Sequence, residues 1–499
     1  MVATKSNMFG RTPIYTSETK INENNIQSII EKAMAIHEKN REEIKYLVEY
    51  EKGNQPILSR TKDVRPEINE RVVENHASQI VNFKTAFVYS SPIRYVQKYE
   101  KETGHEDSPD KDDLYITELN EMCFYENKHI KDQELAKNFL TCGIGYKSAF
   151  ANKNDEYSPF RITVHDPMCT FIIKSADVFH EPKIAVSYWT ENKDKEINVT
   201  HYTAYTDDYV YEFTDRFSEV KKTKNGIGII PIVEYRQDYA CMGCFERVLG
   251  LLDAINVCTS DRVNGLAQFV QSFLWFDNVD INEDDFIALK SAGAFSTSSK
   301  EGHQANVKLI ESSLNQTEIQ SLSDYLYAQL LQICSMPSRE MQSGSTTGQS
   351  SMLSGGWQEA EEDAQRLIEM FEEGERKFLN VIKHILDRSN TNIKSEIRLR
   401  DIDIKFSRNK VSNMLVKTQG MLNMKTFGIH PRIAIQVSDL FGDAQQTYLD
   451  SKEYLEKAYQ TKSKNSNSDV LGMQQDEKGN DPATVKETQN DQMSFQNQG

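Results

Sequence analysis

The chain has 499 residues, with 58 Lys and Arg against 75 Asp and Glu and a formal net charge of −17. Hydrophobic residues make up 38% of the chain, enough for a substantial core, and its length predicts about three domains or modules. The acidic balance argues against a protein that grips duplex nucleic acid through a basic face, because such binding neutralises phosphates with Lys and Arg. It does not exclude a protein that lets DNA pass without holding it.

The sequence carries no signal for export or membrane insertion. The N-terminal residues lack the apolar core of a signal peptide, and no stretch approaches the roughly 18 apolar residues of a transmembrane helix. Seven scattered cysteines fit reduced thiols. These features indicate a cytoplasmic environment.

Helical periodicity dominates the first part of the chain, and strand patterns follow it. Apolar residues at helical spacing predict four helices, over about residues 21–50, 71–89, 113–127 and 129–142. A polar stretch, residues 104–113, predicts a loop. From Gly143, short segments rich in β-branched and aromatic residues predict one antiparallel sheet. Its strands would be residues 143–151, 161–164, 171–173, 183–189, 199–205, 208–213 and 228–235.

Three long helices come next, predicted over about residues 245–273, 317–335 and 357–387. The first two are separated by a short mixed segment, so we expect an antiparallel hairpin with that segment at its tip. Gly374 predicts a kink in the third helix. Beyond it, the pattern predicts a strand over residues 395–407, short helices at about 411–424, 431–437 and 444–459, and disorder over 461–499.

The most unusual segment is residues 341–356, which holds no charge and consists mostly of Ser, Thr, Gly and Gln. This composition predicts a flexible loop, since it cannot pack against itself. A disordered connector without a function of its own is the competing interpretation. The helix that follows begins with Glu359, Glu361, Glu362 and Asp363, which suit a helix N-terminus.

We find no constellation of catalytic, cofactor-binding or metal-ligating residues. The glycines that begin at Gly143 have the wrong spacing for a phosphate loop. Cys241 and Cys244 form a lone CxxC pair, which predicts ordinary thiols because a second ligand pair for zinc is missing. His165 and Asp166 precede a proline and mark a turn. The sequence therefore predicts a protein that is not an enzyme and that has no cofactor or metal.

The order of the elements is more informative than any motif. A sheet-bearing module, a long helix, a compact insertion, a returning helix, a charge-free loop and another long helix follow one another. This succession resembles the portal (head-to-tail connector) proteins of tailed bacteriophages, especially those with long non-contractile tails. The resemblance covers about residues 20–460 and rests on residues 140–146, 165–167, 228–235, 245–256 and 343–351. The family often shows a Ser-Gly-x-Ala-type pattern in the loop; Thr347-Gly348-Gln349-Ser350 stands in its place, which leaves the register of the loop open.

The resemblance implies an α+β portal fold with a wing, a long-helix stem, a small α/β clip and a mainly helical crown. By this comparison the chain divides into an N-terminal and wing region (1–243), a stem helix (244–273), the clip (274–316), a returning stem helix (317–335), the tunnel loop (336–356), a long wing helix (357–388), a wing strand and crown (389–460) and a disordered tail (461–499).

The resemblance also implies a function. Portal proteins form a ring, usually of about twelve subunits, at a unique capsid vertex. The ring is the channel through which double-stranded DNA is packaged and ejected, and it docks the terminase and then the head-to-tail adaptor. The expected partners therefore include these proteins, the major capsid protein and the scaffolding protein. The expected location is the virion, and the host cytoplasm during assembly.

Two groups of candidate site residues follow from the resemblance. The DNA-facing tunnel loop would consist of Ser343, Gly344, Ser345, Thr346, Thr347, Gly348, Gln349, Ser350 and Ser351. The partner-facing residues of the clip would be Asp277, Asp280, Glu283, Asp284, Asp285 and Lys290. Arg339 is the residue next to the loop that would contact a phosphate; a charge that stabilises a helix C-terminus is the equally weighted alternative.

The chemistry of the loop agrees with this assignment. Its hydroxyl and amide side chains would make weak, sequence-independent contacts to phosphate, and the acidic turns behind it would repel the duplex from the wall. Two other classes of protein stay open. A different assembly or scaffold protein predicts filaments or dimers in place of closed rings, and a nucleic-acid-processing enzyme requires a phosphate loop or metal-binding carboxylates that we do not find.

Overall fold

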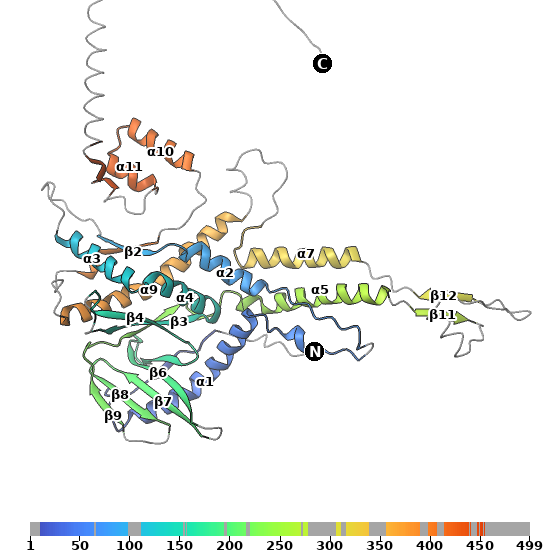
Figure 1. The fold of residues 1–499 in the computed structure, drawn as a ribbon, viewed down its shortest axis with the longest axis horizontal. Helices are drawn as coiled ribbons and strands as arrows, with labels where there is room; N and C mark the ends of the chain where they lie inside the picture. The colour runs from blue at the N-terminus through green and yellow to red at the C-terminus, as the bar shows by residue number, and fades with distance from the viewer. Residues whose placement is uncertain are drawn as a thin grey trace, which may run out of the picture. The chain divides into compact units, whose positions relative to one another are not determined.

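The computed structural model describes residues 10–63, 66–97, 111–152, 155, 157–193, 197–215, 220–270, 273–277, 306–310, 316–338, 356–389, 398–406, 414–438, 440, 447–448, 450–452 and 454 (Figure 1). The chain divides into two compact units, Met1–Asn409 and Lys410–Gly499. Among the described helices, none has both the length and the apolar character that crossing a bilayer requires.

The helices of the first unit confirm the predicted periodicity, with some shifted ends. They are α1 (Ile26–Glu51), α2 (His76–Tyr89), α3 (Lys111–Tyr125), α4 (Lys128–Cys142), α5 (Leu249–Val270), α7 (Gln316–Ile333) and α9 (Trp357–Arg388). Short 3₁₀ turns are η1 (Pro56–Ser59), η2 (Glu246–Val248) and η3 (Leu399–Asp401). The second unit contains α10 (Met414–Thr426) and α11 (Pro431–Ser438).

Two predicted helix ends are wrong for identifiable reasons. The prediction starts the second helix at Arg71, whereas α2 begins after Asn75, whose side chain accepts a hydrogen bond from the Ser78 backbone N–H. The first hairpin helix ends at Val270, because the chain is already in a strand at Phe273. The predicted loop 104–113 overlaps α3, which begins at Lys111; its residues up to 110 lie outside the described part.

The predicted single sheet is in fact two sheets. One has six strands in the order β1 (Ile14–Thr16), β5 (Thr170–Ser175), β6 (Pro182–Lys193), β7 (Ile197–Tyr205), β8 (Tyr209–Thr214) and β9 (Lys221–Lys224). The other has three, in the order β10 (Ile232–Arg236), β3 (Ile144–Ala151) and β4 (Phe160–His165). Periodicity identifies strands but not their partners, so it missed both this division and β1, which pairs in parallel with β5.

A further two-stranded ribbon connects distant parts of the first unit. β2 (Ile93–Gln97) pairs antiparallel with β13 (Ile402–Phe406), with Ile93 opposite Phe406. The predicted strand 395–407 is therefore confirmed only at its end, because η3 occupies residues 399–401 and residues 395–397 lie outside the described part. Helices together with mainly antiparallel sheets confirm the α+β class.

Helix α9 lies at the centre of the main core. Phe371 on this helix contacts the rings of Tyr89, Phe139 and Tyr235, with centroid distances of 5.0, 5.9 and 4.9 Å. Gly374, at which the sequence predicts a kink, lies within the continuous helix α9 and has a packing role there. A Cβ at this position would lie 2.5 Å from Cδ1 of Tyr235, so only glycine lets that ring pack against the helix.

Four buried charged side chains join α9 to α4 and to the three-stranded sheet; we call Lys128, Asp132, Lys147 and Glu375 the charge cluster. The ammonium of Lys147 lies 2.7 Å from both Asp132 Oδ1 and Glu375 Oε2, and that of Lys128 lies 2.7 Å from Glu375 Oε1. Two cations and two carboxylates balance, so the cluster has no net charge.

Two tyrosines also donate hydrogen bonds to the carboxylate of Glu375. Tyr235 and Tyr95 donate their hydroxyls to its two carboxylate oxygens, at 2.8 and 2.5 Å. Burial alone would raise the pKa of Glu375, but the ammonium groups of Lys128 and Lys147 outweigh it and hold that pKa well below its ordinary value. The stabilisation is therefore present above the unfolded-state pKa of about 4 and is lost as the pH falls further.

We predict that Glu375→Ala lowers the free energy of unfolding by about 3–5 kcal/mol, because it leaves two buried ammonium groups with one carboxylate. The matched control is Glu372→Ala on the same helix, which breaks only a partly exposed pair with Arg376 and should cost at most about 0.5 kcal/mol. Urea unfolding followed by circular dichroism measures both. Equal midpoints for the two variants would show that the cluster does not anchor α9.

Candidate functional site

The predicted helical hairpin is present, with a strand ribbon at its tip. α5 and α7 lie side by side, and β11 (Phe273–Asp277) and β12 (Asn306–Ile310) extend beyond their ends (Figure 1). The two strands are antiparallel, with Phe273 opposite Ile310. Asp277 ends β11, opposite Asn306, whereas the other predicted clip residues, Asp280, Glu283, Asp284, Asp285 and Lys290, lie outside the described part of the chain.

The two ends of the predicted tunnel loop meet at the other end of the hairpin. Residues 339–355, which include Arg339 and Ser343–Ser351, lie outside the described part. Gly356 precedes α9 with a φ of +76°, and a Cβ placed there would lie 3.5 Å from the Met336 carbonyl oxygen and 3.6 Å from Pro337 Cα. The chain therefore leaves the hairpin and returns to α9 at nearly the same point.

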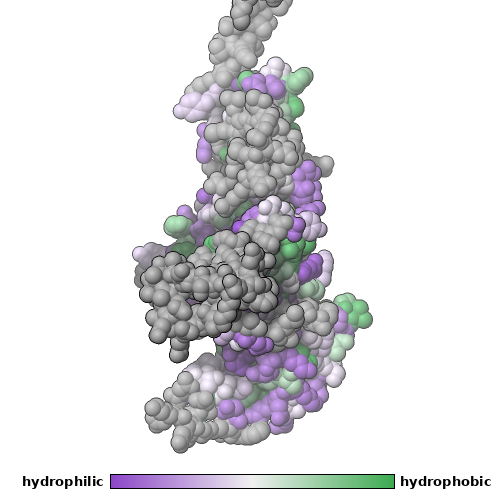
Figure 2. All heavy atoms as spheres, turned by 90° about the vertical axis from the view of Figure 1, so that its right-hand side faces the viewer, coloured by the Kyte–Doolittle hydropathy of each residue, from purple (hydrophilic) through white to green (hydrophobic). Residues whose placement is uncertain are grey.

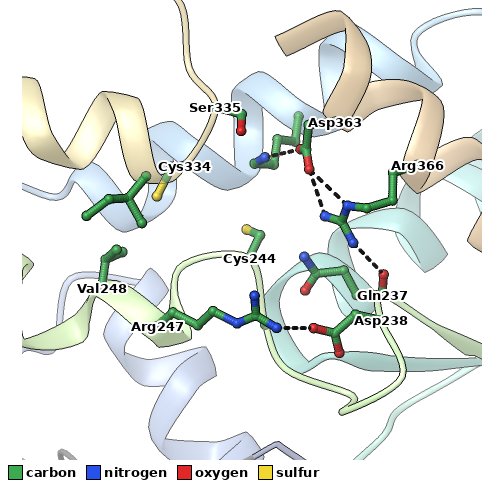
Figure 3. A pocket seen from close by; sticks show the side chains of 12 residues that line it. Gln237, Asp238, Cys244, Arg247, Val248, Cys334, Ser335, Asp363 and Arg366 are labelled. Carbon is green, nitrogen blue, oxygen red and sulfur yellow. Dashed lines mark hydrogen bonds and ion pairs between the residues drawn. The ribbon is translucent and has the colours of Figure 1, made fainter. Parts of the chain in front are cut away.

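A small cavity lies at this point, which we call the loop root (Figure 3). Its volume is about 80 Å³, room for on the order of two water molecules, so it is a joint between elements and not a substrate pocket. The start of α9, the end of α7, the segment before α5 and one side chain of α2 line it. Residues separated by up to 282 positions in the sequence, from Lys84 to Arg366, meet here.

Ion pairs fix the start of α9 at the loop root. Lys84 on α2 pairs with Asp363, and Arg366 lies 2.7 Å from the same carboxylate (Figure 3). Arg366 also donates to the Gln237 carbonyl oxygen at 3.5 Å. Burial alone would raise the pKa of Asp363, but Lys84 and Arg366 lower it below its ordinary value. The sequence predicts Asp363 only as part of an acidic helix start. In the structure, its ion pair with Lys84 connects α9 to α2.

The cysteines at the loop root are thiols, one buried (Cys334) and one half-buried (Cys244). All seven cysteines of the chain are free. Burial raises the pKa of Cys244 to about 12 and that of Cys334 to about 11, so both stay protonated near neutral pH. Among the described residues, no group of three His, Cys, Asp or Glu side chains is arranged to hold a metal ion.

A polar face of α5 binds an extended segment of the chain. Asn256, Ser260 and Asn264 are buried and spaced one turn apart. Each accepts a hydrogen bond from an alternate backbone N–H, namely those of Glu74, Val72 and Glu70, at 2.8, 3.0 and 2.7 Å.

Asn264 and Ser260 also donate back to the carbonyl oxygens of Glu70 and Val72, at 3.0 and 3.4 Å. We call these contacts the polar ladder. One helical turn rises about 5.4 Å and two strand residues span about 6.6 Å, so the spacings match closely enough for successive contacts. Sequence reasoning missed the ladder, because α5 carries other polar residues, such as Asp261 and Arg262, which hide the spacing of Asn256, Ser260 and Asn264.

The N-terminal segment is tied to the base of the hairpin. Glu246, in the turn before α5, accepts hydrogen bonds from the Gly10 and Gly243 backbone N–H groups at 3.3 and 2.8 Å. Its carboxylate lies 2.7 Å from the buried guanidinium of Arg11. The hairpin is thus held by the N-terminal segment, the polar ladder and the loop root.

Comparison with known proteins agrees with this architecture. The family described as "Phage portal protein, SPP1 Gp6-like" matches residues 30–453. The match covers most of the chain, from within α1 through the hairpin to beyond α11, and leaves out β1; the chain belongs to this family of portal proteins from phages with long non-contractile tails. No curated protein matches the chain in a sequence search.

We predict that Asn264→Ala lowers the free energy of unfolding by about 1–3 kcal/mol, because it removes two partly buried hydrogen bonds with the backbone N–H and C=O of Glu70. The segment 66–74 should also exchange its amide hydrogens faster. Asn82→Ala, at an exposed asparagine of α2 that donates to Ser78 Oγ of its own helix, is the control and should change stability by about 0.5 kcal/mol or less. Unchanged exchange in Asn264→Ala would contradict the ladder.

Proposed function

We propose that the protein forms a ring at one capsid vertex and that the ring is the channel for double-stranded DNA during packaging and ejection. The observation that carries this proposal is the hairpin: a strand ribbon projects from one end, and a charge-free loop leaves and returns at the other. This arrangement suits a conduit wall, with the ribbon available to partners and the loop available to the DNA. The family match supports the same role.

The exposed face of the hairpin supports closure into a ring. Six apolar side chains of α5 and α7 are at least 40% exposed: Val257, Val263, Leu266, Leu322, Tyr325 and Ile333. On the described surface that faces the viewer in Figure 2, hydrophilic residues predominate around small hydrophobic patches. We therefore expect exposed apolar side chains on both helices of this projecting hairpin to be buried against another copy, and about twelve copies are the number that the family implies.

The tunnel loop would contact the DNA only weakly, so that the duplex can slide past it. Ser343–Ser351 offers hydroxyl, amide and backbone groups but no cation, so contacts to phosphate would be weak and independent of base sequence. Behind the loop, Glu359 and Glu362 are exposed at the start of α9. In a ring these carboxylates are repeated in every subunit and would keep the duplex away from the wall. Arg339 remains our candidate for a phosphate contact.

We further propose that the clip, residues 274–316, docks the terminase during packaging and the head-to-tail adaptor afterwards, and that capsid and scaffolding proteins contact the rest of the ring. Its acidic residues from Asp277 to Asp285, with Lys290, would face these partners. The protein itself would have no catalytic activity, and the terminase would supply the ATP hydrolysis that moves DNA. The ring would reside at the capsid vertex of the virion after assembly in the host cytoplasm.

We predict that the double variant Leu266→Lys with Tyr325→Lys dissociates the ring, because it places charges at two exposed apolar positions of the hairpin that neighbouring copies would bury. The control, Leu266→Val with Tyr325→Leu, keeps both positions apolar and should assemble. Mass measurement with negative-stain imaging checks both. Rings without an axial hole, or no rings from the unaltered protein, would refute the proposed function itself.

We predict that replacing Thr347, Gly348 and Gln349 with Leu leaves rings intact but strongly reduces the amount of DNase-protected DNA in packaging reactions. Bulky apolar side chains would obstruct the channel and remove the polar contacts. The control, Thr347→Ser with Gly348→Ala and Gln349→Asn, keeps the loop small and polar and should package normally. Monomeric or unfolded protein from the Leu variant would count against the loop assignment.

A further inference from the structure

A groove of about 1260 Å³ lies at the far end of α9 from the loop root. Ile385 and Arg388 place it at the C-terminal end of a helix of 32 residues, which separates it from Gly356 by about 45 Å. α3, the end of β3, the segment before β4, and residues of β7, β8 and 225–231 form other walls. The volume exceeds that of a typical small-molecule site and matches a peptide segment. The proposed DNA channel makes no use of it.

Two exposed tyrosines form one wall of the groove. Tyr125 and Tyr157 are 48% and 68% exposed, yet their rings are in contact, with centroids 5.2 Å apart. Asp155 organises the pair, because it accepts hydrogen bonds from the Tyr157 backbone N–H at 2.9 Å and from the Tyr125 side chain. Aromatic faces carry negative potential, so such a pair beside a carboxylate attracts a Lys or Arg side chain.

The charges that line the groove are predominantly negative. Glu118 and Glu121 lie one turn apart on the exposed face of α3, and the structure shows no ion pair between either of them and another described residue. Arg388 is the cation among the described lining residues. Its guanidinium donates a hydrogen bond to the Ile227 carbonyl oxygen and also contacts Nδ1 of His384. Together with Asp155, the groove therefore presents three carboxylates to whatever enters it.

The floor of the groove is apolar. Met122 and Ile385 contribute buried aliphatic side chains, and Phe150 contributes a half-buried ring. A segment that alternates basic and apolar side chains would therefore satisfy both the walls and the floor. DNA would not, because its phosphates would meet the three carboxylates.

We propose that this groove binds a Lys- or Arg-bearing peptide segment of another protein. A basic side chain lies against the Tyr125–Tyr157 pair, between Asp155 and the glutamates of α3, and an adjacent apolar side chain covers the floor. Charge complementarity selects this occupant over nucleic acid and over an acidic segment. The site would attach the portal to a partner at a position remote from both the ribbon and the loop.

The test uses the intact protein and a fluorescein-labelled peptide in which Lys and Leu alternate. Fluorescence anisotropy should show saturable binding of this peptide and none of the matched peptide with Glu in place of Lys. Glu118→Gln with Glu121→Gln should weaken binding by about fivefold, and Tyr157→Ser by about threefold. All substituted side chains are exposed, so thermal unfolding should be unchanged.

The control variant separates a specific groove from the effect of net charge. Glu31→Gln with Glu42→Gln removes two equally exposed carboxylates from α1 and should leave binding unchanged. An equal loss of binding in this control, no effect of Tyr157→Ser, or no binding of the Lys peptide would each overturn the proposal. A change in ring mass with the groove variants would also overturn it, because the occupant would then be a second copy of this chain.

Discussion

The charge cluster around Glu375 is the constraint on which the rest of the first unit depends. It joins the middle of α9 to α4 and β3, and Tyr235 and Tyr95 extend the contact to β10 and β2. A buried ion-pair network contributes less net stability than an apolar core of the same size, but it tolerates only one arrangement of its members. The register of α9 against the sheet is therefore fixed in the middle of the helix.

This register determines where the two ends of α9 lie. At the N-terminal end, Asp363 meets Lys84, and Gly356 meets the end of the hairpin, so the loop root is assembled by the same helix. At the C-terminal end, Ile385 and Arg388 complete the acidic groove. One continuous helix of 32 residues thus links the loop root with the proposed peptide-binding groove.

The hairpin is attached largely through hydrogen bonds between its polar side chains and backbone groups of other segments. The polar ladder binds alternate backbone groups between Glu70 and Glu74, and Glu246 binds the backbone of Gly10 and Gly243. Within one chain, several apolar side chains of α5 and α7, such as Leu266 and Tyr325, stay exposed on this attached hairpin. The proposed ring would bury such side chains between neighbouring copies.

The sequence by itself determined the long helices, most of the strands, the hairpin with its tip, the uncharged loop and the order that marks the family, because periodicity and composition are local properties. It did not determine that the strands form two sheets, that Arg71 precedes α2 in an extended segment, or that Asp363 is an ion-pair partner and not merely a helix-start charge. Nor could it find the cluster, since Lys128, Lys147 and Glu375 look like surface charges in the sequence. Only the tertiary structure decided these points, because hydrogen bonds and ion pairs between residues hundreds of positions apart depend on which surfaces pack together.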